Sequence, residues 1–116
     1  MSDVARHLGA KVLCGRDKLA LNMDTAFSSD LMSDVLAHVD SNCLLLTGLA
    51  NEHVIRTADM VDIQCVVFVR GKVIQEDIVE MAKKRGIVVM CCDKSLYESS
   101  GVLYQQGLSA IGMGSD

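Results

Sequence analysis

The chain has 116 residues, of which 50% are hydrophobic and none is proline or tryptophan. This length and composition predict one globular domain that buries a core without disulfide or metal crosslinks, and they exclude a disordered linker. The net charge of −4 argues against a nucleic-acid-binding surface. No apolar run is long enough to span a bilayer, and residues 1–4 lack the pattern of a signal peptide. We therefore expect a cytoplasmic protein with no membrane contact.

A short helix and a short strand are predicted at the start of the chain. Ser2 is placed to cap a helix over residues 3–8, and Gly9 is placed to end it. Residues 11–14 form an apolar run that closes in a turn signal at residues 15–17. This run is expected to be a strand, although the sequence leaves open where it joins the sheet.

A second strand and a second helix are predicted before residue 40. Apolar and polar side chains alternate over residues 19–25, which predicts a half-buried strand. Ser28 or Ser29 is expected to cap the helix, with Asp30 favourable in its first turn. The apolar stripe of this helix, at helical spacing, consists of Leu31, Met32, Val35, Leu36 and Val39.

From residue 43 the sequence repeats a strand followed by a helix three times. The apolar runs begin at Cys43, Cys65 and Ile87, at an even spacing of about 22 residues. Each run is short, uninterrupted and rich in branched side chains, as in strands that are buried on both faces. A helical pattern follows each run. Gly86 is expected to end the second of these helices, and Ser95 to cap the third.

This order of elements predicts an α/β fold. We expect a layered α/β/α arrangement around a mainly parallel sheet of about 4–5 strands, because strand–helix–strand units place parallel strands side by side. Residues 1–108 are expected to form the single domain. Residues 109–116 are small, glycine-rich and polar, and we expect them to form a flexible tail.

The five cysteines lack the spacing of a metal or cluster site. No Cys-x-x-Cys pair is present. Cys43 and Cys65 begin their predicted strands, whereas Cys91 and Cys92 end theirs, and these ends lie roughly 15 Å apart in a parallel sheet. We therefore expect buried thiols, no metal site and no cofactor. An iron–sulfur or metal-binding protein is retained as an alternative hypothesis.

Polar and charged residues gather where the three repeated strands end. In an open parallel sheet, ligands bind beyond these carboxyl ends, where the following helices begin and carry partial positive charge. Arg70, Lys72 and Lys94 add full positive charge, which favours an anion such as a phosphate or a nucleotide. No phosphate-binding glycine loop or nucleophile elbow is present, so we expect no catalytic residues. The candidate ligand-binding residues are Thr47, Gly48, Asn51, His53, Arg70, Gly71, Lys72, Asp93, Lys94 and Ser95.

Several segments of the second half of the chain resemble a known family. They are residues 45–48 (Leu-Leu-Thr-Gly), 66–72, which end in Arg-Gly-Lys, 82–89, 95–98 (Ser-Leu-Tyr-Glu), 101–104 and 107–108. Together they resemble the DRTGG domain, a small α/β module. The name-giving residues are not intact, because residues 51–53 are Asn-Glu-His and residues 69–71 are Val-Arg-Gly.

The first part of the chain extends the resemblance. Leu8 and residues 11–15 are similar to the opening of the N-terminal domain of HPr kinase/phosphorylase, which implies that fold. Residues 27–35 resemble stand-alone relatives that are encoded beside iron-only hydrogenase subunits. The resemblance implies a regulatory or ligand-sensing module, commonly a homodimer, and not an enzyme.

Two kinds of function follow from these observations. The first is a non-catalytic regulatory module that binds a small anionic metabolite or nucleotide, docks on a larger enzyme, or does both. The second is an accessory interaction subunit of a hydrogenase-type redox complex, which predicts an exposed apolar patch and no ligand pocket.

Overall fold

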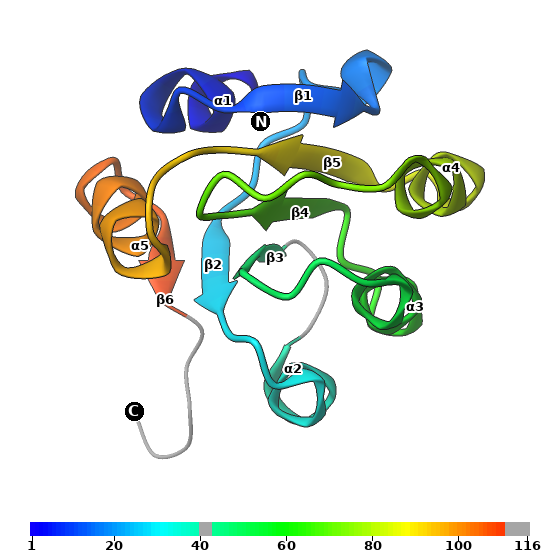
Figure 1. Ribbon diagram of the computed structural model, residues 1–116. Coiled ribbons are helices and arrows are strands. Elements are labelled where there is room, and N and C mark those ends of the chain that lie inside the picture. The colour runs from blue at the N-terminus through cyan, green and yellow to red at the C-terminus, as the bar shows by residue number, and fades with distance from the viewer. Residues whose placement is uncertain (40–42, 111–116) are drawn as a thin grey trace.

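A computed structural model describes residues 1–39 and 43–110 and shows one six-stranded sheet with helices on both faces (Figure 1). The first strand is antiparallel to its neighbour, and all other neighbours are parallel. The predicted α/β class and mainly parallel sheet are confirmed, with six strands where about 4–5 were expected. Across the sheet the order is β1 (Lys11–Cys14), β5 (Val88–Cys91), β4 (Cys65–Phe68), β3 (Cys43–Thr47), β2 (Thr25–Ser28) and β6 (Ser109–Ala110).

The helices form two layers, one on each face of the sheet (Figure 1). Three of them, α2 (Met32–His38), α3 (Glu52–Met60) and α4 (Glu76–Arg85), pack on one face. The opposite face is covered by α1 (Ser2–Leu8) and α5 (Leu96–Gln105). This arrangement confirms the α/β/α layering.

The central strands are buried because both of their faces are covered. Every residue of β3 and β4 is buried, as their uninterrupted apolar runs predict. Side chains alternate between the two cores: Leu45 packs toward α2, α3 and α4, whereas Leu44 and Leu46 pack toward α1 and α5. The three predicted repeat strands are thus confirmed. The loops at their carboxyl ends carry the candidate site residues.

The strand expected at residues 19–25 lies at a different position in the structure. Residues 19–24 form turns and irregular backbone, and the strand lies later, at β2. The backbone of this segment bonds to the start of α1: the Met1 amino group donates to the Leu21 carbonyl at 2.6 Å, and the Ser2 N–H donates to the Leu19 carbonyl at 3.1 Å. These carbonyls therefore accept hydrogen bonds from the first residues of the chain and not from a neighbouring strand. The alternation of apolar and polar side chains alone is not sufficient for a strand here.

The start of α2 also differs from the expectation. The residue that precedes the helix is Leu31, and no side chain caps it. The Ser29 hydroxyl instead accepts a hydrogen bond from the Leu31 N–H at 3.0 Å, so Ser29 shapes the turn between β2 and α2. Asp30 consequently lies in that turn and not in the first turn of the helix.

The expected cap of α1 is wrong, because Ser2 is the first residue of the helix, Met1 precedes it and no side chain caps it. The predicted ends of α1 and α4 and the predicted cap of α5 agree with the structure. Gly9 and Gly86 end α1 and α4 in the left-handed conformation, with φ of 63° and 69°. Ser95 caps α5, where its hydroxyl accepts a hydrogen bond from the Glu98 N–H at 3.1 Å. None of the helices formed by residues 1–39 and 43–110 has the length and apolar character needed to cross a bilayer.

A short strand follows residue 108. Ser109 and Ala110 form β6, which pairs with Thr25 and Ala26 of β2 in parallel, and the Ser109 N–H donates to the Asp24 carbonyl at 2.9 Å. The outer edge of β2 offers backbone groups that need partners, which explains why residues expected in a flexible tail pair there. The rest of that predicted tail, residues 111–116, lies outside the described residues.

Candidate functional site

The carboxyl ends of β2, β3 and β4 meet around one carboxylate, that of Asp30. Its Oδ1 accepts a hydrogen bond from the Thr47 hydroxyl at 3.0 Å and from the Gly48 N–H at 2.7 Å. The Thr47 side chain is fully buried, and its oxygen also accepts from the Leu49 N–H at 3.1 Å. Two of the predicted anion-binding residues therefore bind an anion that belongs to the chain itself.

The backbone after β4 holds Arg70 in an unusual conformation. Arg70 has φ of 68°, which is uncommon for a residue with a side chain. Its N–H donates to the Lys94 carbonyl, and the Gly71 N–H donates to the Cys92 carbonyl, both at 2.8 Å. These bonds fix the turn after β4 against the segment after β5, so Arg70 and Lys94 are neighbours at the sheet edge.

The Arg70 side chain extends over the end of β3. Its Nη2 donates to the Gly48 carbonyl at 3.4 Å and lies 3.9 Å from Asp30 Oδ2. The guanidinium lies directly over Gly48, so a larger residue at this position would displace the flexible end of the Arg70 side chain. The Arg70 and Asp30 side chains are 52% and 50% exposed, and their ion pair is long. The guanidinium therefore keeps donors available to a second anion.

Further charges flank this arginine. Lys72 is exposed and Lys94 is half-buried, and neither has a polar side-chain partner among the described residues. The Asp93 carboxylate packs over Gly71, where an added Cβ would lie 3.1 Å from its Oδ1. Three cationic side chains and two carboxylates thus share the edge.

The remaining predicted residues have structural roles or stand apart. Asn51 caps α3, where its side chain accepts a hydrogen bond from the Val54 N–H at 3.2 Å. Ser95 caps α5 in the same way. His53 is exposed in the first turn of α3 and has no polar side-chain partner within the described part of the chain. The structure therefore brings together Thr47, Gly48, Arg70, Gly71, Asp93 and Lys94, with the exposed Lys72 next to Gly71 in the chain. It does not add Asn51, His53 or Ser95 to that group.

Asp30 is the residue of this edge that the sequence prediction missed. The expected cap at Ser28 or Ser29 puts Asp30 in the first turn of a helix, after a strand expected at residues 19–25. With β2 at Thr25–Ser28, the rule that selected the other candidates also selects Asp30, since it follows the carboxyl end of a parallel strand.

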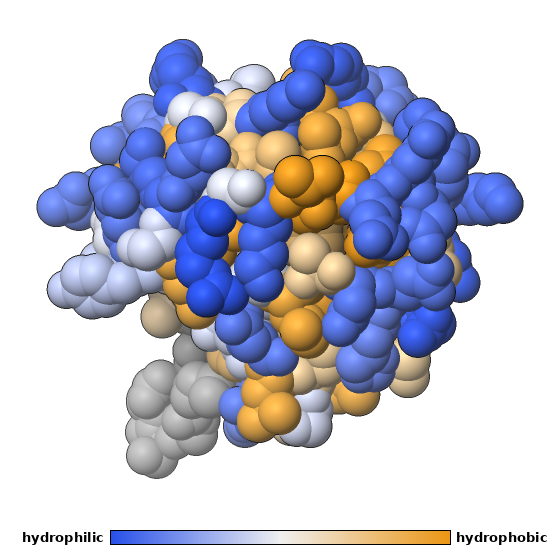
Figure 2. Space-filling model, viewed as in Figure 1, coloured by the Kyte–Doolittle hydropathy of each residue, from blue (hydrophilic) through white to orange (hydrophobic). Residues whose placement is uncertain are grey.

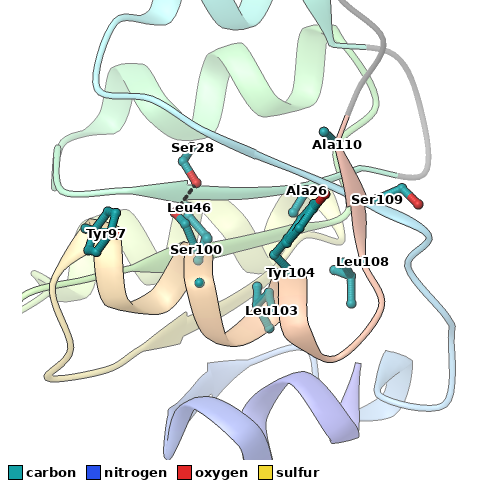
Figure 3. A pocket seen from close by; sticks show the side chains of 11 residues that line it. Ala26, Ser28, Leu46, Tyr97, Ser100, Leu103, Tyr104, Leu108, Ser109 and Ala110 are labelled. Carbon is teal, nitrogen blue, oxygen red and sulfur yellow. Dashed lines mark hydrogen bonds between the residues drawn. The ribbon is translucent and has the colours of Figure 1, made fainter.

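A groove lies on the face of the sheet that α5 covers, between α5 and the strands β2, β3 and β6 (Figure 3). It has a volume of about 310 Å³. Its floor contains Leu46 and Leu103, which are almost completely buried, while Tyr97 and Tyr104 on its wall are 91% and 71% exposed. None of these residues belongs to the predicted set. The pair of tyrosines at a spacing of seven residues, with Gly101 between them, is the signal that would have indicated it.

The surface of the carboxyl edge also has apolar character. Figure 2 shows hydrophobic surface across the middle of this view, with hydrophilic residues on both sides. Two large apolar side chains in the loops that follow β2 and β4, Leu31 and Val73, are 58% and 90% exposed. Contiguous exposed apolar surface is found at contact sites, whereas single exposed apolar side chains are ordinary.

The cysteines do not converge. Cys91 packs toward α4 and Cys92 toward α5, as expected for adjacent residues of an extended segment. Burial raises the pKa of the Cys65 thiol to about 12, and it also raises the pKa of Cys14 and Cys91. Protonated thiols are poor metal ligands. Over residues 1–39 and 43–110, no three His, Cys, Asp or Glu side chains are grouped closely enough to hold a metal ion.

Comparisons with known proteins identify relatives of this fold. The family model of the DRTGG domain matches residues 3–105. A crystal structure of the CBS and DRTGG domains from the regulatory region of Clostridium perfringens pyrophosphatase, complexed with its activator diadenosine tetraphosphate, is similar with a TM-score of 0.72 and 12% identity. The match covers 93% of this chain and 47% of the other, so the chain spans about half of that structure. A search of curated protein sequences finds no match.

Proposed function

The chain belongs to the DRTGG-domain family, and on this basis we propose that it is a non-catalytic regulatory module that binds a small anionic ligand, a nucleotide in particular, at the carboxyl edge of its sheet. The similar regulatory region of the pyrophosphatase was crystallised with a nucleotide activator, which supports the choice of ligand class.

The observation that supports this proposal most strongly is the arrangement of Arg70 around Asp30. The turn after β4 fixes the arginine backbone in the left-handed region, yet within residues 1–39 and 43–110 the guanidinium makes only one long hydrogen bond and one long ion pair. A cation that is positioned by the backbone but weakly paired is suited to bind an incoming phosphate, since guanidinium donors match phosphate oxygens in pairs. Lys72 and Lys94 increase the positive charge beside it.

Asp30 gives the site a means of regulation. Its carboxylate binds the Thr47 hydroxyl and the Gly48 N–H, which are the donors that a bound phosphate would use. A phosphate that approaches Arg70 repels this carboxylate. Binding is therefore coupled to the turn between β2 and α2, which Asp30 tethers to the end of β3, and the ligand changes the surface formed by that turn.

The exposed apolar side chains support docking as a second element of the function. Leu31 lies next to Asp30 in the turn between β2 and α2, and Val73 follows Lys72. We propose that this surface contacts a larger enzyme or a second copy of the chain, and that the ligand modulates this contact. Light scattering with the ligand absent and present measures the second case: a strict monomer in both conditions would contradict homodimer formation.

A thermal-shift titration with ATP, ADP and inorganic phosphate tests the proposed ligand site. A ligand at 100 times its dissociation constant stabilises the folded state by about 2.7 kcal/mol. The wild type is expected to show this stabilisation with at least one nucleotide, and Arg70→Gln is expected to require at least about tenfold more ligand, because it loses a charge-assisted contact. Arg56→Gln is the matched control, since this exposed arginine of α3 pairs with Glu52 and is not one of the residues of the proposed site. An equal response of both variants, or no response of the wild type, would refute the site.

A further inference from the structure

The groove along α5 has the size and lining of a small-molecule site. Its volume of about 310 Å³ is at the lower end of the range for ligand pockets, which suits one ring system and its substituents. Small residues create it from both sides: Gly101 lacks a side chain on α5, and Ala26 and Ala110 lie on the paired strands β2 and β6. Larger side chains at these positions would fill the groove.

Two tyrosines of α5 line the groove. Tyr97 and Tyr104 are seven residues apart on α5, a separation of about 10 Å along the helix axis. Figure 3 shows Tyr97 at one end of the labelled side chains, Ser28 and Ser100 between it and Tyr104, and Leu108 and Ser109 beyond Tyr104. Both rings are largely exposed. An exposed tyrosine ring stabilises the fold much less than a buried one, so these two rings do little for the core. Exposed rings beside an apolar floor are suited to stack on a flat aromatic ligand.

One hydrogen-bond acceptor is directed at this space. The Ser100 hydroxyl donates its proton to the Leu96 carbonyl at 2.7 Å. In the contact between Ser28 and Ser100, at 2.6 Å, the Ser28 hydroxyl must therefore be the donor. The lone pairs of Ser28 then remain available, and they would accept a hydrogen bond from an amino or imino N–H group on the edge of a bound ring.

The groove and the charged edge are neighbours in the chain. Ser28 lines the groove, and Asp30 lies two residues later. Leu46 on the groove floor directly precedes Thr47, and Tyr97 follows Lys94 by three residues. An extended residue spans about 3.3 Å, so the groove and the edge lie within the length of one nucleotide.

We propose that this groove binds the base of the nucleotide, with the ring against Gly101 between Tyr97 and Tyr104 and a ring N–H donated to Ser28. The inference rests on the proposed function for the phosphate end, but the base site is independent of Arg70. It assigns a binding role to residues of α5 that the carboxyl edge does not use.

Nucleosides test the groove separately from the charged edge. The probes are adenosine, guanosine, cytidine and uridine, measured by calorimetry against the wild type and three variants. Gly101→Leu fills the groove, and Gly101→Ala fills it partly without strain, since an added Cβ there has no neighbour within 4 Å. Gln105→Leu is the matched control, because Gln105 is exposed on α5 and does not line the groove. At least one nucleoside is expected to bind, and Gly101→Leu is expected to weaken it by at least about tenfold, the loss typical of a base–aromatic stack.

The outcomes separate this inference from the proposed function. If ATP binds and depends on Arg70 but no nucleoside binds, or if Gly101→Leu and Gln105→Leu bind the nucleoside equally, the base site is refuted and the anion site stands. If a nucleoside binds and Gly101→Leu abolishes it while Arg70→Gln leaves ATP binding unchanged, the base site stands and the anion site is refuted. If Gly101→Leu only converts a dimer into a monomer and no nucleoside binds, the groove is an interface between copies, which overturns the inference.

Discussion

Replacement of Asp30 by asparagine should make the protein less stable and the anion site stronger. In the Asp30→Asn variant the amide oxygen keeps an acceptor for the Thr47 hydroxyl and the Gly48 N–H, which lie 3.0 and 2.7 Å from the carboxylate in the wild type. The variant loses the charge that strengthens these two bonds and the long, half-exposed pair with Arg70. Hydrogen bonds to charged groups contribute about 1.5–3 kcal/mol and neutral ones about 1 kcal/mol, and half exposure reduces the difference.

We therefore expect Asp30→Asn to lower the free energy of unfolding by about 1 kcal/mol, and Asp30→Ala by about 2–3 kcal/mol because the alanine leaves the buried Gly48 N–H without an acceptor. For a domain of this size, about 1 kcal/mol corresponds to a change in Tm of about 4 °C. The affinity for ATP should change in the opposite direction, with Asp30→Asn binding at least about threefold more tightly, since the competing carboxylate is gone.

Urea denaturation and calorimetry measure the two quantities on the same samples. Asp34→Asn is the matched control: it makes the same charge change four residues later, at an exposed position of α2 that has no polar side-chain partner within the described residues. If Asp30→Asn binds ATP no better than Asp34→Asn, or if Asp30→Ala unfolds with the wild-type free energy, the view of Asp30 as a competing internal anion is refuted.

Three further predictions concern the scaffold. Gly15→Ala should lower the Tm by several degrees, because Gly15 has φ of 84° and an added Cβ would lie 2.8 Å from Val88 Cγ2; an unchanged Tm would contradict this packing. Leu45→Ala should lower the free energy of unfolding by about 2–5 kcal/mol, since Leu45 is fully buried in the core, and a loss below about 1 kcal/mol in urea denaturation would refute that burial. The folded-state pKa of Cys65 is raised from 9.0 to about 12, so its contribution to stability is complete below pH 9 and is lost as the pH rises toward 12. Denaturation from pH 8 to 12 should show this loss of stability in the wild type and a smaller loss in Cys65→Ala. Iodoacetamide should modify the half-buried Cys91 before the buried Cys65. Equal pH profiles of the two proteins, or the reverse order of modification, would contradict the burial of Cys65.

The repeated half of the fold could be predicted from sequence because its signal is strong and local. Uninterrupted apolar runs beginning at Cys43 and Cys65 allow little except strands buried on both faces. Residues 19–25 carried a weaker signal, since their alternation depends on Leu21, which is 45% exposed, and their carbonyls bond to the start of α1. That contact joins residues about twenty positions apart, and no periodicity reveals it.

The candidate site was predictable in location but not in its internal pairing. The rule that ligands gather at carboxyl ends of parallel strands placed Thr47, Gly48 and Arg70 correctly at one edge. It did not indicate that Asp30 binds their donors, because that contact requires the position of β2 in the sheet. The groove on α5 was missed for a related reason: it depends on β6, whose two residues form a strand only because β2 offers them an edge.

The central claim is that an anion binds beside Arg70 and competes with Asp30, and an NMR titration tests it most directly. Amide resonances of isotopically labelled protein are followed as ATP is added. We expect the largest shifts on the N–H groups of Gly48, Arg70 and Gly71, because the first is bound to Asp30 and the others hold the arginine turn. Shifts confined to other parts of the chain, or a spectrum that ATP leaves unchanged, would contradict it.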